Sequence, residues 1–308
     1  MVDKGHDFEL ENKKRIDFES TNEYKKQRDK KILLKMIKKH HYLSIIKKAI
    51  NRKRIAKLSH EERENDFHTK DNSKFTGKVA VYTCITGGYD KLEDPCVHEN
   101  NVDYFAFVDD VSKYDVKGWK IKEIPAEIKE LVNNDNVLVN RYVKFHPGDV
   151  IDDKYDYAVY IDGNIKVMGE ISPLVGAVNL KTGLALHRHR QRGSLYDEIK
   201  VCLMLKKGNK KKLKEQFRKY EREGFPKEFG LYECNVIISD LRNKKSAKIL
   251  DDWWNEFKRS ESYRDQIALP YVIWKNGLKY EDVGSLGNNV YRNQKFMLDS
   301  DIHKGANE

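Results

Sequence analysis

The stretch AVYIDGNIKV, residues 158–167, interrupts an apolar run with one carboxylate and one amide. Residues 158–161 and 165–167 have the composition of buried strand, and Asp162 and Asn164 stand between them on either side of a glycine. Carboxylate and amide oxygens are ligands that hard divalent cations prefer. The pattern therefore predicts either a simple turn or a site that holds a metal ion and a phosphorylated ligand.

Polar residues follow other predicted strands in the same way. Residues 79–85 alternate as a strand that ends just before a pair of glycines, and the run DYFAFVDD, residues 103–110, ends on two aspartates. Strands that alternate with helices predict an α/β sheet, and such sheets bind ligands beyond the carboxyl ends of their strands. We therefore expect the strand ends to converge on one site. The candidates there for binding a phosphorylated ligand are Thr83, Gly87, Gly88, Tyr89 and Asp109.

Six motifs, in their order along the chain, resemble one family. They are YTCITGGYDKL, RYVKFHP, YIDGNI, HRQRGSLYDE, GLYECNVIISD and a last one that runs from WWNEF to SYRDQIALPYVIWK. The family is a glycosyltransferase-like one, first catalogued as a domain of unknown function. Its plant members are linked to cell-wall and mucilage polysaccharides, and its bacterial members to surface polysaccharides such as capsule. The resemblance covers about residues 78–285. It implies a GT-A type of glycosyltransferase, with a Rossmann-like α/β sheet and a nucleotide-sugar donor.

The resemblance implies a metal site at the Asp-Gly-Asn segment. Many GT-A enzymes hold a divalent cation with Asp-x-Asp, and the cation neutralises the departing diphosphate as a Lewis acid. Here Asn164 replaces the second aspartate and offers a carbonyl oxygen without charge. We predict that Asp162 is catalytic and that Asp162, Asn164 and His189 hold Mn²⁺ or Mg²⁺.

Two further motifs supply cations for the donor. Lys144 lies in RYVKFHP, and Arg192 lies in HRQRGSLYDE. A guanidinium grips phosphate oxygens with two parallel hydrogen bonds, so we assign Arg192 to the diphosphate. Glu198 follows in the next predicted helix, where it is either a surface acid or part of the site.

The segment SYRDQIALPYVIWK, residues 262–275, begins a predicted helix with charged and amide groups. Asp265 caps this helix, or it resembles the aspartate of the Asp-Gln pair in glycogenin-like transferases. In the second case it deprotonates the acceptor hydroxyl or binds the donor sugar. Inverting and retaining chemistry both stay open. The predicted substrate-binding residues are Arg264, Gln266, Glu233 and Asn235.

Residues 25–57 concentrate the positive charge of the chain. They contain 14 Lys and Arg and a single acid, Asp29, whereas the net charge of all 308 residues is +10. Apolar residues recur there at a helical spacing and predict an amphipathic helix. Its apolar stripe packs on the rest of the protein, or attaches to an anionic membrane surface. Nucleic-acid binding is a third hypothesis, which the slightly acidic remainder of the chain disfavours.

We divide the chain into a basic helical arm with a linker, residues 1–70, and a GT-A-like domain, residues 71–308. No run of about 18 apolar residues is present, and the first residues do not resemble a secretory signal. The four cysteines lack CxxC spacing, which favours reduced thiols in the cytoplasm.

These observations predict a cytoplasmic glycosyltransferase, peripheral on the inner face of the membrane. It would move a sugar from a nucleotide-sugar to a surface polysaccharide or a lipid-linked glycan. Two alternatives stay open: a GT-A-shaped module that binds nucleotide or glycan without turnover, and a nucleic-acid-associated protein.

Overall fold

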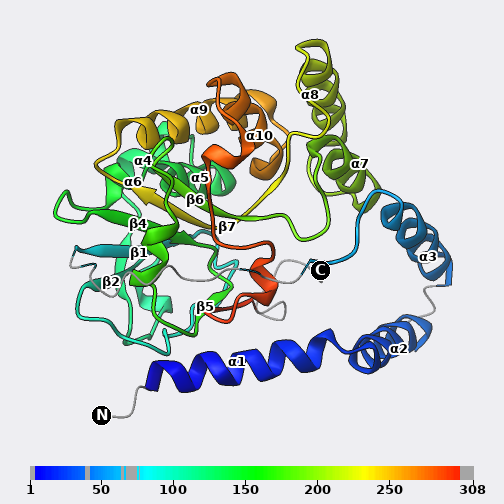
Figure 1. The fold of residues 1–308 in the computed structure, drawn as a ribbon, viewed down its shortest axis with the longest axis horizontal. Coiled ribbons are helices and arrows are strands. Elements are labelled where there is room, and N and C mark those ends of the chain that lie inside the picture. Colours follow the sequence, from blue (N-terminus) through cyan, green and yellow to red (C-terminus); the bar gives the residue numbers. More distant parts are fainter. Residues whose placement is uncertain (1–3, 39–41, 64–65, 67–74, 76, 299–308) are drawn as a thin grey trace.

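The computed structural model describes residues 4–38, 42–63, 66, 75 and 77–298 (Figure 1). Within these residues a seven-stranded sheet has the strand order β3-β2-β1-β4-β7-β6-β8, and β5 pairs with β9 in a smaller sheet. The strands are β1 (Val79–Ile85), β2 (Val102–Val108), β3 (Lys120–Glu123), β4 (Tyr157–Ile161), β5 (Ile165–Val167), β6 (Leu184–Arg188), β7 (Tyr232–Asp240), β8 (Gly284–Ser285) and β9 (Phe296–Leu298). The predicted α/β fold class is confirmed.

The central strands of the large sheet are buried on both faces, as parallel strands usually are, whereas the edge strand β3 has no buried residue. Every residue of β1 is buried. Alternate side chains enter two different apolar clusters, with Ala80 and Tyr82 on one face and Val79 and Val81 on the other. The apolar composition of residues 79–85 therefore reflects two layers that cover the sheet.

Helices cover the first face, and short segments cover the second (Figure 1). The first layer contains α4 (Ala126–Leu131), α5 (Asn136–Phe145), α6 (Pro147–Val150), α9 (Lys244–Ser260) and α10 (Asp265–Lys275). The second face packs on the 3₁₀ helices η2 (Ser172–Ala177) and η4 (Val290–Arg292) and on the small sheet. A third apolar cluster joins α10 to α7 (Leu195–Leu205) and α8 (Lys210–Arg222). The remaining 3₁₀ helices are η1 (Val111–Lys113) and η3 (Tyr280–Asp282).

The strand order reverses next to β1. The parallel strands β1, β2 and β3 run outward in one direction, and β4 pairs in parallel with the other side of β1. A crevice forms at such a switch point, beyond the carboxyl ends of the two central strands. Since β7 is antiparallel to β4, the amino end of β7 also reaches this crevice.

The N-terminal arm consists of α1 (Lys4–Ser20), α2 (Asn22–Lys38) and α3 (Tyr42–Ala56), which form an arc beside the rest of the protein (Figure 1). Asn12 of α1 is 1% exposed and donates hydrogen bonds to the carbonyls of Gln294 (2.7 Å) and Phe296 (3.1 Å). At the other end of the arc, Asn51 of α3 donates to the carbonyl of Met204 at 3.1 Å. Both ends of the arm are therefore docked.

Part of the predicted linker is also docked. The backbone N–H of His60 donates to the carbonyl of Gln191 at 2.9 Å, and that of Arg63 donates to the carbonyl of Arg190 at 3.0 Å. Residues 64–65 and 67–70 of the predicted linker lie outside the described residues.

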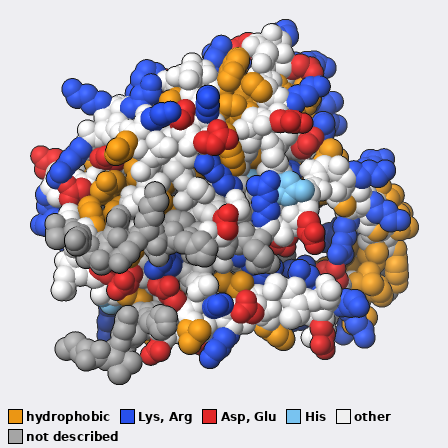
Figure 2. Space-filling view, in the orientation of Figure 1, with side chains coloured by type: hydrophobic (Ala, Val, Ile, Leu, Met, Phe, Trp, Pro, Cys, Tyr) orange, Lys and Arg blue, Asp and Glu red, His pale blue; other side chains and the backbone are white. Residues whose placement is uncertain are grey.

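The hypothesis that the apolar stripe packs on the protein is wrong. Among the described residues of α2 and α3, none is buried. Leu43 is 84% exposed and Ile46 is 58% exposed, and Figure 2 shows apolar side chains gathered on the outer side of these helices. In the part of the chain that the structure describes, no helix has the length and apolar content needed to span a membrane.

Candidate active site

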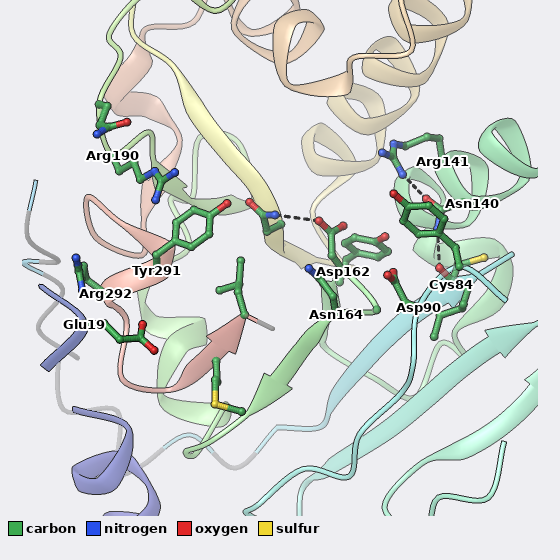
Figure 3. A pocket seen from close by; sticks show the side chains of 18 of the residues that line it. Glu19, Cys84, Asp90, Asn140, Arg141, Asp162, Asn164, Arg190, Tyr291 and Arg292 are labelled. Atoms are coloured by element: carbon green, nitrogen blue, oxygen red, sulfur yellow. Dashed lines mark hydrogen bonds between the residues drawn. The ribbon is translucent and has the colours of Figure 1, made fainter. Parts of the chain in front are cut away.

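A cleft of about 1450 Å³ opens at the switch point (Figure 3). Thr86, Gly87 and Asp90 line it beyond β1, and the Asp-Gly-Asn segment lines it beyond β4. Asn140 and Arg141 of α5 form the adjoining wall. Ligand pockets usually have volumes of about 300–1,000 Å³, so the cleft has room for more than one ligand.

Asp162 faces this cleft in a fixed orientation. Its Oδ2 accepts a hydrogen bond from Nδ2 of Asn235 at 3.0 Å, and its backbone N–H donates to the carbonyl of Asn235 at 2.9 Å. Its Oδ1 lies 3.6 Å from Nζ of Lys144, and the side chain is 29% exposed. The carboxylate is therefore positioned by β7 and α5 and is open to a ligand.

Behind Asp162, a buried carboxylate holds two cations. Oδ2 of Asp265 accepts from Nζ of Lys144 at 2.8 Å and lies 3.1 Å from Nε of Arg141. Burial raises the pKa of Asp265, but Arg141 and Lys144 together lower it well below its ordinary value. Since a general base works best when its pKa lies near the working pH, this environment disfavours the predicted role as a base. Asp265 instead positions Lys144 and Arg141.

The alternative hypothesis, that Asp265 only caps the amino end of α10, explains part of its contacts. Arg264 occupies the N-cap position of α10 without a side-chain cap. Asp265 is the first residue of the helix, and its Oδ1 accepts from the N–H of Gln266 at 2.9 Å. The other carboxylate oxygen holds the two cations, so capping does not account for the whole side chain.

Carboxylate and amide side chains, which are the types that can hold a divalent metal, lie near the turn after β4. A Cβ atom at Gly163 would lie 2.9 Å from Oδ2 of Asp90, so a glycine is needed for Asp90 to lie against this turn. Asp90, Asp162 and Asn164 consequently line the same part of the cleft (Figure 3). Among the described residues, no three His, Cys, Asp or Glu side chains are grouped to hold a metal by themselves. Enzymes often bind Mg²⁺ with one or two carboxylates together with substrate phosphates, and this turn fits that pattern.

His189 does not fit the predicted metal set. Its Nδ1 accepts from the backbone N–H groups of Gln191 (3.1 Å) and Arg192 (2.9 Å), and its Nε2 lies 3.0 Å from Nη2 of Arg192. Burial and the neighbouring Arg192 and Arg190 lower the pKa of His189 to about 2. Both ring nitrogens are engaged, and one faces a guanidinium, so we remove His189 from the metal ligands.

Arg192 also differs from its predicted role. Its Nε donates to Oε2 of Glu198, and its side chain is 12% exposed. It does not line the cleft, whereas Arg190 does. The Arg190 guanidinium lies over the Tyr291 ring, 4.1 Å from its centroid. Of these two arginines, Arg190 is therefore the one that a ligand in the cleft can reach.

The predicted substrate-binding residues divide into two groups. Asn235 lines the cleft, whereas Glu233 and Gln266 are buried behind it. Nε2 of Gln266 donates to the carbonyl of Tyr232 at 2.7 Å and lies 3.3 Å from Oε2 of Glu233. Burial raises the pKa of Glu233. Arg264 lies 3.9 Å from Glu198 and is likewise outside the cleft lining.

The residues around β1 that were predicted to bind a phosphorylated ligand also divide. Gly87 and Tyr89 line the cleft, while Thr83 is fully buried within the strand. Gly87 and Gly88 have φ angles of +63° and +61°, a conformation that glycine adopts without strain. The carboxylate of Asp109 accepts from the N–H of Gly87, so it holds this turn in place.

Several cleft residues were not predicted from the sequence. Asp90 lies in the quoted TGGYD motif, and Arg141 precedes Lys144 by three residues, a spacing that places both on one face of a helix. Both residues could therefore have been predicted from the sequence. Arg190 stands beside Arg192 and the histidines in a cluster that the sequence indicates for an anionic substrate. Its contact with Tyr291 arises only through the fold, and no local pattern indicates it.

The strand order and the switch point define an α/β domain with a polar cleft beyond the carboxyl ends of β1 and β4. The model of the TOD1/MUCI70 glycosyltransferase-like domain matches residues 55–294, well over half of the chain, and this protein belongs to that family. The predicted family is thereby confirmed. The match begins earlier than the resemblance of residues 78–285 and includes the docked segment around residue 60.

Solved glycosyltransferases share a distant likeness with the chain. The galactosyltransferase LgtC is 12% identical, with a TM-score of 0.35 over 62% of this chain and 69% of its own. Mouse xyloside xylosyltransferase 1 is 9% identical, with a TM-score of 0.39 over 67% and 83%. The glycosyltransferase GlyE of Streptococcus pneumoniae TIGR4 is 11% identical, with a TM-score of 0.36 over 68% and 44%. Scores this low carry no argument, so the family assignment rests on the family match alone.

Two short matches concern GTPases. The chain is 39% identical to the Ras-related protein RABG3b of Arabidopsis thaliana over 44 residues, and 36% identical to the Ypt/Rab-type GTPase avaA of Emericella nidulans over 50 residues. These matches span 22% and 24% of those proteins. The sequence contains no GxxxxGK[ST] motif, which cradles the phosphates in P-loop proteins. The GTPase matches therefore do not bear on the cleft.

Proposed function

We propose that this protein is a GT-A-type glycosyltransferase that moves a sugar from a nucleotide-sugar donor to a glycan or polysaccharide acceptor. The observation that carries the proposal is the position of Asp162. It extends from the carboxyl end of β4 into the switch-point cleft, next to two cations that a buried carboxylate holds. Membership of the glycosyltransferase-like family supports the same class of reaction.

The cations would stabilise the negative charge of the leaving group. Arg141 lines the cleft, and Lys144 lies 3.6 Å from Asp162 with 2% of its side chain exposed. Because Asp265 already fixes both cations, they need little reorganisation when the donor bond breaks, and such preorganised charge is effective in catalysis.

Asp162, Asn164 and Asp90 would hold a divalent metal together with the donor phosphates. When bound, Mn²⁺ or Mg²⁺ would act as a Lewis acid toward the diphosphate oxygens. Asn235 would keep the Asp162 carboxylate oriented through its 3.0 Å hydrogen bond, since outer partners of this kind fix the direction of metal ligands.

A donor screen tests this proposal. The full chain is incubated with UDP-, GDP- and CDP-sugars, and donor hydrolysis, transfer to glycan acceptors and the melting temperature are measured with and without Mn²⁺. We expect one donor to raise the melting temperature and to be turned over. Binding without turnover would favour the non-catalytic module, and neither binding nor turnover would overturn the proposal.

We also propose that the arm attaches the enzyme to an anionic membrane surface, such as the cytoplasmic face of a cell membrane. Large apolar side chains on α2 and α3 are exposed: Ile32, Leu33, Leu34, Ile37, Tyr42, Leu43, Ile46 and Ile50. The same two helices are rich in Lys and Arg. Each basic residue near an anionic surface contributes about 1 kcal/mol to binding, and the apolar face would enter the interface. A salt-sensitive RNA shift by the full chain would instead favour nucleic acid.

A further inference from the structure

The cleft has a second wall that the N-terminal arm supplies. At one end lie Asp90, Arg141 and Asp162, and at the other lie Glu19, Arg190 and Arg292 (Figure 3). Four basic residues of the arm line this other end, and we call them the arm wall: Arg15, Lys25, Arg28 and Arg52. Figure 2 shows the hollow between the arm and the rest of the protein, with basic side chains at its edges.

The arm wall is held in place at both ends. Beyond the hydrogen bonds of Asn12, Nη1 of Arg292 donates to the carbonyl of Ile16 at 3.0 Å, and Lys295 pairs with Glu9 at 2.7 Å. The α2 helix between the docked ends buries none of its described residues. Its inner side therefore borders the cleft instead of filling it.

One carboxylate joins two guanidinium groups of the arm wall. Asp29 lies 2.6 Å from Nη1 of Arg52 and 3.6 Å from Nη2 of Arg28. The hydrogen bond from Arg52 lowers the pKa of Asp29, so the carboxylate stays ionised. Two positive groups share one negative group, and the side chains of Arg28 and Arg52 are 55% and 76% exposed. The two guanidinium groups therefore keep a net positive charge and N–H donors that a ligand can use.

The opposite side of the same hollow is also basic. The Arg190 guanidinium is fixed over the Tyr291 ring at 4.1 Å. Arg292 is 9% exposed at its side chain, and its Nε is buried without a hydrogen-bond partner among the described residues. Glu62 also lines the hollow, 3.7 Å from Arg190 and 3.8 Å from Arg292, and Glu19 pairs with Arg15 at 2.8 Å. The basic residues of the lining still outnumber these acids, so a group bound here would meet cations from both sides.

We propose that the arm wall is an acceptor subsite that binds a phosphate group on the acceptor. This inference rests on the glycosyltransferase function proposed above. The donor occupies the switch-point end, and the volume of the cleft leaves room for a second ligand. Guanidinium groups bind phosphate with paired hydrogen bonds. Because the arginines of the arm wall carry a net positive charge, they favour a doubly charged phosphate group over a neutral sugar. The phosphate belongs to a lipid-linked glycan or to a soluble phosphorylated glycan.

The test measures binding of inorganic pyrophosphate to the full chain by calorimetry, with the donor found in the screen, and any metal that this donor needs, already bound. The variant is Lys25→Glu/Arg28→Glu. The matched control is Lys26→Glu/Lys30→Glu, which makes the same charge change on the same helix at residues outside the cleft lining. We expect the affinity to fall at least about tenfold in the variant, as when a charge-assisted contact is lost, and to stay unchanged in the control.

Equal affinity in all three proteins, or an equal loss in the variant and the control, would overturn the inference. Donor hydrolysis measured alongside separates the two proposals, since loss of the arm wall should leave it intact. Sedimentation with phosphatidylglycerol vesicles separates a phosphate-binding subsite in the cleft from a direct contact of these residues with lipid headgroups. If the variant loses vesicle binding but keeps pyrophosphate binding, these residues face lipid and the subsite is wrong.

Discussion

Asp162 and Asp265 lie in one charged cluster, but their carboxylates differ in what they can do. Asp162 is 29% exposed and open to the cleft. The Asp265 side chain is 9% exposed, and its Oδ2 forms ion pairs with Lys144 and Arg141. A ligand can therefore approach Asp162 directly, whereas it meets Asp265 only through the two cations.

We expect Asp162→Asn to abolish transfer without unfolding the protein. The amide has the same shape, and Lys144 keeps its closer partner, Asp265, at 2.8 Å. If Asp162 faces the donor as proposed, removing its charge should lower the rate by at least about a hundredfold, a loss typical of a missing electrostatic group. The rate, the melting temperature and the Mn²⁺-dependent shift are measured. Asp251→Asn, at an exposed surface acid, is the control, and full activity of Asp162→Asn would remove Asp162 from the site.

Asp265→Asn should lower both stability and activity. Without its carboxylate, Lys144 remains as a buried cation, and breaking a buried pair typically costs about 3–5 kcal/mol. Donor binding should weaken because Lys144 and Arg141 lose their fixed positions. Chemical denaturation, the donor dissociation constant and the rate are compared with the native chain. A variant with unchanged stability and donor affinity but a large rate loss would restore the role of Asp265 as a general base.

At this scale the sequence shows which residues have usable chemistry but not which of them meet. The interrupted strand around Asp162 is a local signal. The Lys144–Asp265 contact joins residues 121 positions apart, and the engagement of both nitrogens of His189 depends on a loop conformation. Such contacts arise from tertiary packing, and no spacing rule predicts them.

At the level of elements, the turn between β4 and β5 determines where the oxygen ligands lie. Gly163→Ala places a methyl group 2.9 Å from Asp90 Oδ2 and 2.9 Å from Cγ1 of Ile85. We expect lower stability and weaker Mn²⁺-dependent donor binding, because overpacking typically costs about 1–3 kcal/mol and Asp90 must move. Gly148→Ala is the control, since nothing lies within 4 Å of its added Cβ. If both variants melt and bind alike, the close approach of Asp90 to this turn has no role.

Two buried histidines, one in β6 and one just after it, predict that the protein loses stability in acid. Burial lowers the pKa of His187 to about 3, and burial with nearby arginines lowers that of His189 to about 2. Unfolded histidine titrates near pH 6.5, so between these values the unfolded state binds more protons. Stability is therefore full above about pH 6.5 and falls as the pH decreases, by about 1.4 kcal/mol per pH unit for each histidine.

Unfolding free energies from urea titrations between pH 7 and pH 5 check this slope. His187→Gln should reduce the slope by about half, because it removes one of the two titrating histidines. The variant should still fold, since the glutamine amide oxygen can accept from Nδ2 of Asn293, which lies 2.9 Å from Nε2 of His187 in the native protein. His60→Gln, at an exposed histidine, should leave the slope unchanged. A slope that is the same in all three proteins would show that these histidines do not control acid unfolding.

Several elements could be predicted because they carry local patterns. The strand expected at residues 79–85 is β1, and the apolar part of residues 103–110 lies in β2. The direction of β7 could not be predicted, because its pairing with β4 depends on segments far apart in the chain. That direction is what brings Asn235 beside Asp162 at the switch point.

At the level of the whole molecule, the arm presents two surfaces. Its inner side lines the cleft through the arm wall, and its outer side exposes the apolar residues of α2 and α3. The sequence predicted an amphipathic basic helix, but the periodicity alone could not show which side would face the protein. If the outer side lies on a bilayer, an acceptor held at that surface is already next to the cleft.

The last prediction concerns this outer side. Leu43 and Ile46 of α3 are 84% and 58% exposed, so Leu43→Glu/Ile46→Glu should leave the fold and donor hydrolysis unchanged. Each substitution removes apolar area and adds a negative charge, so sedimentation with phosphatidylglycerol vesicles should fall by at least about tenfold. The control is Leu131→Glu/Leu180→Glu, which changes two side chains of similar exposure, 62% and 83%, outside the arm.

Vesicle binding should also weaken as salt rises, because the Lys and Arg residues of α2 and α3 contribute through screened charges. A purely apolar attachment would not show this dependence. If both double variants sediment as well as the native chain, the outer side of the arm does not bind the bilayer, and the exposed apolar residues must serve another contact.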